Sequence, residues 1–164
     1  MTIKKSLFGI APVAAAVVIA GCGGGSGNSY SAPAQGTNAA HSSAGITIAH
    51  GKLGSYLTGA KGRALYLFEA DKGSSSTCYS ACASLWPPLT TATTTFAGTG
   101  VQSSLLGTTK RTDGTHEVTY DGHPLYYYAA DTSAGSTTGQ GLNQFGGKWY
   151  LVAPNGNKID DDAS

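Results

Sequence analysis

Beyond residue 44, the chain alternates short apolar runs with turns rich in glycine, aspartate and serine. Runs of this length and alternation are typical of β-strands joined by tight turns. We predict strands at residues 46–50, 53–58, 64–68, 105–112, 115–120, 120–128 and 149–152. Asp113-Gly114 and Asp121-Gly122 separate such runs, and Asp-Gly is a strong hairpin signal because both turn residues need a positive φ. The predicted fold class is all-β, mainly antiparallel.

One segment has helical character, residues 78–85, preceded by Ser76 and Thr77 and followed by Pro87-Pro88. Serine or threonine can cap the start of a helix through its side-chain oxygen, and proline cannot continue a helix. The sequence therefore predicts one short helix in an otherwise β domain.

The domain, placed at residues 44–160, repeats itself at an offset of 60 residues. Residues 62–71 lie over residues 122–131, and seven of the 16 positions in 62–77 are identical to their counterparts. Two copies are too few for a solenoid. We therefore expect the first copy (about residues 46–89) and the second copy (about residues 105–154) to complete one core between them.

Aromatic residues mark the same place in both copies. Alternation along a strand puts Tyr66 and Phe68 on one face, and Tyr126 and Tyr128 on the matching face of the second copy. Core packing accounts for most of these rings. The chain has nine tyrosines, and some of their hydroxyl groups must reach water. A partly exposed aromatic surface for a glycan or protein partner is therefore the functional alternative.

The N-terminus has the features of an export signal. Lys4 and Lys5 precede an apolar stretch, and the 16 residues from position 6 to 21 carry no charge. A membrane-spanning helix needs roughly 20 predominantly apolar residues, so a cleaved signal peptide over residues 1–21 is favoured. The chain is therefore expected to leave the cytoplasm.

The signal ends in Ile-Ala-Gly-Cys at residues 19–22, which resembles the lipobox of bacterial lipoproteins. The resemblance implies that Cys22 becomes the lipidated first residue of the mature chain, with the membrane as its partner. Gly23 stands where an aspartate would favour the inner membrane. The expected location is the cell envelope, at the outer membrane facing the periplasm if the cell has two membranes. Residues 22–43, rich in glycine and serine, are expected to form a flexible tether.

The charge balance excludes some function classes. Ten Lys plus Arg against nine Asp plus Glu give a formal charge of +1, and loss of Lys4 and Lys5 with the signal leaves 8 − 9 = −1. A near-neutral chain offers no electrostatic footprint for nucleic acid. The sequence also lacks a Gly-x-Ser-x-Gly elbow and a phosphate-binding glycine loop followed by lysine. We therefore expect neither an enzyme nor a cofactor.

Cys78 and Cys82 are the two thiols that remain once Cys22 is lipidated. An even pair in an exported protein is typical of a disulfide. At positions i and i+4 of a regular helix the Cβ atoms lie too far apart for that bond, so either Cys78 precedes the helix or the pair is reduced. The alternative function is envelope copper binding or redox and electron transfer through these thiols, because thiolates with imidazole suit Cu(I).

His116 and His123 flank the predicted turn at Asp121-Gly122. A two-residue turn there puts His116 opposite Tyr127 and separates the two imidazoles by roughly 13 Å along the sheet, at about 3.3 Å per residue. They cannot hold one metal ion by themselves. We interpret both as surface or turn residues.

Asp71 and Asp131 end equivalent strands and precede loops rich in serine, threonine and glycine. Their side-chain oxygens are expected to cap those turns. Calcium binding is the weaker alternative, since no further carboxylates follow at ligand spacing.

A Tyr-x-aromatic-x-x-Asp motif occurs twice, first as Tyr66, Phe68 and Asp71 and then as Tyr126, Tyr128 and Asp131. Further matching features are Cys78-x-x-x-Cys82, Trp86-Pro87-Pro88-Leu89, Gly139-Gln140-Gly141 and Trp149. In this pattern the chain resembles a bacterial family of secreted-repeat lipoproteins over about residues 46–154. Ser80 departs from it, where a glycine often falls between the cysteines.

That family carries no established biochemical function, so the resemblance implies localisation and architecture but no mechanism. Together with the lipobox, it predicts a lipid-anchored lipoprotein of the cell envelope. We expect a binding or interaction module whose ligand is an envelope protein or a glycan.

Overall fold

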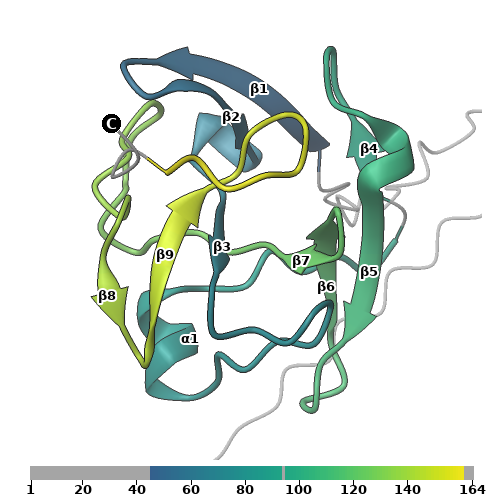
Figure 1. Ribbon diagram of the computed structural model, residues 1–164. Helices are drawn as coiled ribbons and strands as arrows, with labels where there is room; N and C mark the ends of the chain where they lie inside the picture. Colours follow the sequence, from purple (N-terminus) through teal and green to yellow (C-terminus); the bar gives the residue numbers. More distant parts are fainter. Residues whose placement is uncertain (1–44, 94, 161–164) are drawn as a thin grey trace, which may run out of the picture. The chain divides into compact units, whose positions relative to one another are not determined.

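Residues 45–93 and 95–160 are described by a computed structural model of the chain (Figure 1). The predicted signal peptide, Cys22 and the tether lie outside the described residues. Within the described part, no helix is long and apolar enough to cross a membrane.

The described residues contain nine short strands in three sheets. The strands are β1 (Gly45–Gly51), β2 (Gly54–Thr58), β3 (Tyr66–Phe68), β4 (Phe96–Ala97), β5 (Leu106–Lys110), β6 (His116–Tyr120), β7 (His123–Pro124), β8 (Asn143–Gln144) and β9 (Gly147–Leu151). The sheet orders are β2-β1-β4, β3-β9-β8 and β5-β6-β7, and among these pairings only β1 with β4 is parallel. The prediction of a mainly antiparallel all-β fold is confirmed.

The helical segments of the described chain are α1 (Ala81–Leu85) and the short 3-10 turns η1 (Ala60–Gly62) and η2 (Ser103–Leu105). α1 begins three residues later than predicted. Thr77 does not cap it, because its N–H and its hydroxyl both donate to the carboxylate of Asp71. The helix ends before Pro87-Pro88, as predicted.

Equivalent two-residue turns occur in both copies. Asp121 and Gly122 have φ values of 49° and 77°, as their Asp-Gly sequence predicts. Lys61 and Gly62, at the corresponding positions of the first copy, have φ values of 59° and 68°. Lysine gives no turn signal of its own, so the turn at Lys61 follows from the repeat and not from local propensity.

The turn at Asp113-Gly114 differs from the prediction. Only Gly114 has a positive φ, at 86°. The N–H of Arg111 donates to the carbonyl of Thr115 at 2.9 Å, which closes a three-residue loop. In loops of this length a single left-handed residue at the end is sufficient.

The predicted strand over residues 120–128 is shorter in the structure, where β7 covers only His123–Pro124. The N–H of Leu125 still donates to the carbonyl of Val118 at 3.0 Å, and beyond Leu125 the second copy leaves β6 and meets the first copy. Tyr66 and Tyr126 each donate a backbone N–H to the other's carbonyl, both at 2.9 Å. This reciprocal bridge lies at the centre of an approximate twofold relation between the copies.

Each motif segment pairs with the C-terminal segment of the other copy. In the first copy, the N–H of Glu69 donates to the carbonyl of Lys148 at 3.0 Å, next to the β3–β9 pairing. In the second copy, the N–H of Ala129 donates to the carbonyl of Leu85 at 2.9 Å. The copies therefore exchange strands and do not fold side by side.

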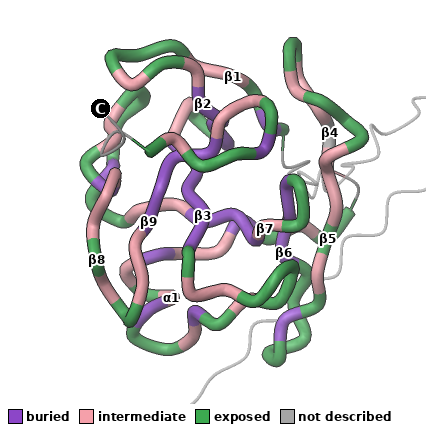
Figure 2. Tube along the Cα trace, viewed as in Figure 1, coloured by how far each residue is buried: buried purple, intermediate pink, exposed green. Residues whose placement is uncertain are grey.

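Both faces of the motif segments are buried. Leu65 and Leu67 join one apolar cluster, whereas Tyr66 and Phe68 join a second cluster around Trp86. Figure 2 shows buried residues concentrated in β2, β3, β6 and β9. The predicted alternation is confirmed, because successive residues enter opposite clusters.

Candidate functional site

Four aromatic rings form a continuous stack in the second cluster. The ring centroids of Phe68 and Trp149 lie 4.0 Å apart, those of Trp149 and Trp86 3.9 Å, and those of Trp86 and Tyr128 4.4 Å. Phe68 and Trp86 belong to the first copy and the other two to the second, so the copies alternate along the stack. Each such pair contributes about 0.5–1.5 kcal/mol beyond its buried area.

Gln144 of β8 accepts hydrogen bonds from the indole N–H groups of both tryptophans. Its side-chain oxygen accepts a hydrogen bond from Trp86 Nε1 at 2.9 Å, and its carbonyl accepts one from Trp149 Nε1 at 3.2 Å. A buried tryptophan N–H needs such a partner. Sequence reasoning missed Gln144, and the only available signal was its position a few residues before Trp149.

The motif aromatics do not form an exposed surface. Tyr66, Phe68, Trp86, Tyr126 and Trp149 are all buried, and Tyr128 is half-buried. The partly exposed aromatic platform considered from the sequence is therefore not made by these residues. The hydroxyl groups of Tyr66 and Tyr126 find partners inside the protein instead.

The tyrosine of each motif bonds to the aspartate of the other motif. Tyr66 Oη donates to Asp131 Oδ2 at 2.5 Å, and Tyr126 Oη donates to Asp71 Oδ2 at 2.8 Å. Burial raises the pKa of both phenols above the usual value, so both stay protonated as donors. The Tyr-x-aromatic-x-x-Asp spacing thus creates a clamp between the two copies.

The second oxygen of each aspartate bonds to the loop that follows it. Thr77 donates to Asp71 Oδ1 through its N–H at 2.7 Å and through its hydroxyl at 2.9 Å. Asp131 Oδ1 accepts from the N–H and hydroxyl of Thr138 at 3.0 and 2.6 Å, and from Ser136 Oγ at 2.8 Å. The carboxylates therefore organise turns as well as the contact between copies.

These surroundings shift the two carboxyl pKa values in opposite directions. Burial raises the pKa of Asp71 above its usual value, and the hydrogen bonds from Thr77 and Tyr126 offset only part of that effect. Burial also acts on Asp131, but the bonds from Thr138, Tyr66 and Ser136 outweigh it and hold its pKa below the usual value. The second-copy carboxylate is the more firmly ionised of the two.

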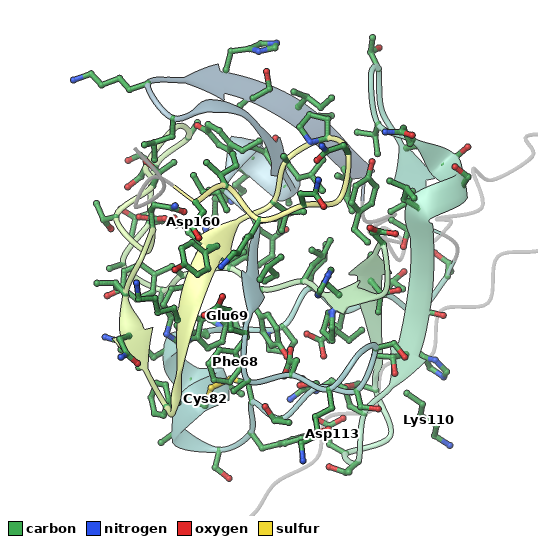
Figure 3. All side chains as sticks on the ribbon, in the orientation of Figure 1. Phe68, Glu69, Cys82, Lys110, Asp113 and Asp160 are labelled. Carbon is green, nitrogen blue, oxygen red and sulfur yellow. A yellow bond between two sulfur atoms is a disulfide. The ribbon has the colours of Figure 1, made fainter. Side chains whose placement is uncertain are left out.

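Cys78 and Cys82 form a disulfide, with their Cα atoms 5.2 Å apart (Figure 3). Cys78 precedes α1, so the regular-helix geometry that would separate the pair does not apply. Both sulfurs are used by the bond, which leaves no thiolate for copper. Within the described residues, no group of three or more His, Cys, Asp or Glu side chains is placed to hold a metal ion.

Arg111 and Glu117 form a buried ion pair that the sequence did not reveal. Arg111 Nη1 lies 2.6 Å from Glu117 Oε2, and Nη2 donates to the carbonyl of Cys78 at 2.7 Å. Glu117 Oε1 is buried and has no hydrogen-bond partner within the described residues. Burial raises the pKa of Glu117 to about 7, since Arg111 offsets only part of the cost of removing the charge from water.

The two histidines lie apart. His116 is exposed, and its carbonyl accepts a hydrogen bond from the N–H of Thr91 at 2.9 Å. It is therefore not opposite Tyr127, because the chain leaves β6 after β7. His123 lies opposite Tyr120 and lines a hollow in the surface.

This hollow, the Glu69 hollow, has a volume of about 630 Å³ and lies beside β3. It is lined by Leu67, Phe68, Glu69, Asp71, Gly73, His123, Asn157 and Lys158. Lys158 Nζ lies 2.7 Å from Glu69 Oε1 and 3.0 Å from Asp160 Oδ2; Glu69 and Asp160 are labelled in Figure 3. Two motif residues, Phe68 and Asp71, therefore contribute to a concave site of the size that takes small ligands.

The chain matches the model of a known protein family. A family model described as a secreted repeat of unknown function matches residues 47–90 and again residues 107–153. No curated protein and no solved structure matches the chain. The two matched segments correspond to the two copies that exchange strands in the fold.

Proposed function

The chain belongs to the family of secreted repeats of unknown function, and from that premise we propose that it is a lipid-anchored binding module of the cell envelope and not an enzyme. Cys22 carries the lipid in this proposal, and the β domain binds the ligand. In a cell with two membranes the proposed location is the outer membrane, facing the periplasm.

The lipid anchor is supported by the order of elements at the N-terminus, where charged residues, an apolar stretch and small residues lead to Cys22. Each buried lipid methylene adds about 0.8 kcal/mol of membrane affinity. We expect Cys22→Ala to abolish labelling by an alkyne fatty acid and to release the protein from membranes. The matched control, Cys78→Ala with Cys82→Ala, should retain both properties. Labelled Cys22→Ala protein would disprove the anchor.

The Glu69 hollow is the observation that supports ligand binding. Its lining combines apolar Leu67 and Phe68 with two carboxylate residues, Glu69 and Asp71, and one lysine, Lys158. Small-ligand sites combine an apolar lining with a few convergent polar groups in this way. The excess of carboxylates favours a polar ligand that presents hydrogen-bond donors or a positive charge.

Three sugars of similar size test this site. Glucosamine, N-acetylglucosamine and glucose differ in whether they carry a positive charge, and each is titrated into ¹⁵N-labelled protein. We expect glucosamine to give the largest shifts of the His123, Asn157 and Lys158 amide signals, and Glu69→Gln to weaken them. Lys61→Asn, which changes a charge outside the hollow, is the control. If none of the three sugars shifts these signals, the hollow is not a site for such ligands.

A further inference from the structure

A second hollow lies beside the motif segment of the second copy. It has a volume of about 430 Å³. It is lined by Ala60, Lys61, Arg63, Tyr127, Ala129 and Thr132. We call it the Arg63 hollow.

The two hollows are related by the repeat. Tyr127 and Ala129 occupy the positions of Leu67 and Glu69 in the second copy, and Arg63 occupies the position of His123 in the first. Each hollow therefore combines the motif segment of one copy with a residue that directly follows the positive-φ turn of the other copy, His123 in the Glu69 hollow and Arg63 in this one. The presence of one hollow beside each motif segment is a consequence of the approximate twofold relation between the copies.

The equivalent positions carry different charges. Lys61 stands where the second copy has Asp121, and Ala129 stands where the first copy has Glu69. The lining of the Arg63 hollow consequently includes Lys61 and Arg63 but no carboxylate residue. The Glu69 hollow, by contrast, is lined by two carboxylate residues and one lysine.

Arg63 is held in place without being neutralised. Its Nε donates to the carbonyl of Asp131 at 2.9 Å and its Nη2 to the carbonyl of Tyr128 at 2.8 Å. The carboxylate of Asp131 bonds to Tyr66, Ser136 and Thr138 instead. Among the described residues no ion pair is formed by Arg63, so the hollow is lined by an arginine whose charge no carboxylate offsets. A guanidinium is well suited to carboxylate and phosphate groups.

Tyr127 adds a hydrogen-bond donor. Its hydroxyl oxygen accepts the N–H of Ala60 at 3.0 Å, and the guanidinium of Arg63 lies 4.5 Å from its ring centroid. Within the part of the chain that the structure describes, the hydroxyl proton itself has no acceptor. A side chain at Gly59 would clash with this hydroxyl, so the glycine leaves room for the Tyr127 hydroxyl at this position. The phenol can therefore donate to a group in the hollow.

From this arrangement we propose that the Arg63 hollow binds the oxyanionic group, carboxylate or phosphate, of a small ligand. Arg63 and Lys61 supply the positive charge, and the hydroxyl of Tyr127 supplies a directed hydrogen bond. This goes beyond the proposed function, because it gives the duplicated domain a second site with the opposite charge preference.

The test is a titration of the full ¹⁵N-labelled chain with inorganic phosphate and, separately, with acetate. We expect the amide signals of Arg63, Tyr127 and Thr132 to shift with at least one of them. A third arm uses phosphatidylglycerol vesicles, and a response to vesicles in place of the free anions would assign the group to a lipid headgroup. If none of the three arms shifts these signals, the proposal is wrong.

Two exposed substitutions make the test specific. Lys61→Asn removes one charge but suits the positive φ, and it should weaken binding about two- to fivefold, as expected for one exposed ion pair. Ala129→Glu places the first copy's carboxylate in this hollow and should weaken binding about tenfold or more. Unchanged binding in Ala129→Glu would overturn the proposal.

A matched control separates this hollow from the Glu69 hollow. Lys72→Asn removes an exposed charge at the position equivalent to Thr132 and should leave anion binding unchanged. Glu69→Gln should also leave it unchanged, although it weakens binding in the Glu69 hollow. The proposals of ligand binding in the two hollows can therefore be confirmed or disproved independently of each other.

Discussion

Ser80 adopts a backbone conformation that suits glycine. Its φ is 52° and its ψ is −119°, in a region that L-residues with a side chain avoid. We expect Ser80→Gly to raise the free energy of unfolding by about 0.5–1 kcal/mol, because relief of strain exceeds the entropy lost by glycine. Urea denaturation measures the change.

The control for this prediction lies one helical turn away. Ser84 is within α1, where glycine is unfavourable, so Ser84→Gly should lower the free energy of unfolding by about 0.5–1 kcal/mol. If both substitutions changed stability in the same direction, strain at Ser80 would not be the explanation.

The single residue Glu117 is expected to make the free energy of unfolding depend on pH. Its pKa is about 7 in the folded protein against an ordinary value of 4.5. Between these values the native state binds a proton that the unfolded chain does not, so stability rises as the pH falls through this window. We expect the free energy of unfolding to be higher at pH 5 than at pH 8 by on the order of 1–3 kcal/mol.

Urea denaturation of Glu117→Gln at both pH values checks the assignment. The variant cannot take up the proton, so its difference between pH 5 and pH 8 should be much smaller. Asp113→Asn serves as the control, because hydrogen bonds from Thr115 hold the pKa of Asp113 below its usual value, outside this window. A pH profile that Glu117→Gln leaves intact would assign the dependence to other groups.

At the scale of elements, the Tyr–Asp clamp joins the motif segments of the two copies. Tyr66→Phe removes a donor from the buried carboxylate of Asp131, which should cost about 1–3 kcal/mol of stability. Tyr126→Phe should cost a similar amount through Asp71. Tyr128→Phe, at a half-buried ring of the stack, should change stability by less than about 0.5 kcal/mol. Equal effects of all three variants would argue against the clamp.

Local sequence patterns correctly predict the elements whose structure depends on neighbouring residues in the chain. Alternation located most strands, Asp121-Gly122 gave a positive-φ turn, and Pro87-Pro88 marked the end of α1. The start of α1 was misplaced because Thr77 bonds to Asp71, six residues earlier. The end of β7 was misplaced because Tyr126 pairs with Tyr66 of the other copy. Both errors arise from partners that periodicity does not show.

In the candidate site, too, the sequence predicts the local features but not the contacts between distant residues. The motif residues were found by self-comparison, but Tyr66 meets Asp131 only through the exchange of strands. Arg111 and Glu117 lie in a segment that predicts a simple hairpin, and nothing local indicates that both charges are buried. The hollows likewise depend on a turn and a motif segment about 60 residues apart, which only the fold brings together.

At the scale of the whole molecule, neither copy has a complete core of its own. β3 of the first copy pairs with β9 of the second, and the aromatic stack alternates between Phe68 and Trp86 of one copy and Trp149 and Tyr128 of the other. A fragment of residues 44–100 would expose half of that stack to water. Buried aromatic side chains contribute too much to stability for such a fragment to stay folded.

We therefore expect fragments 44–100 and 101–160 to be unfolded separately and to assemble when mixed. Near-ultraviolet circular dichroism reports the assembly, because Trp86 and Trp149 stack at 3.9 Å only across the two copies. Trp149→Ala in the second fragment should prevent assembly, since loss of a buried tryptophan costs about 3–5 kcal/mol. A fragment that folds alone would show that each repeat is a domain, and the strand exchange would then be an association of two preformed units.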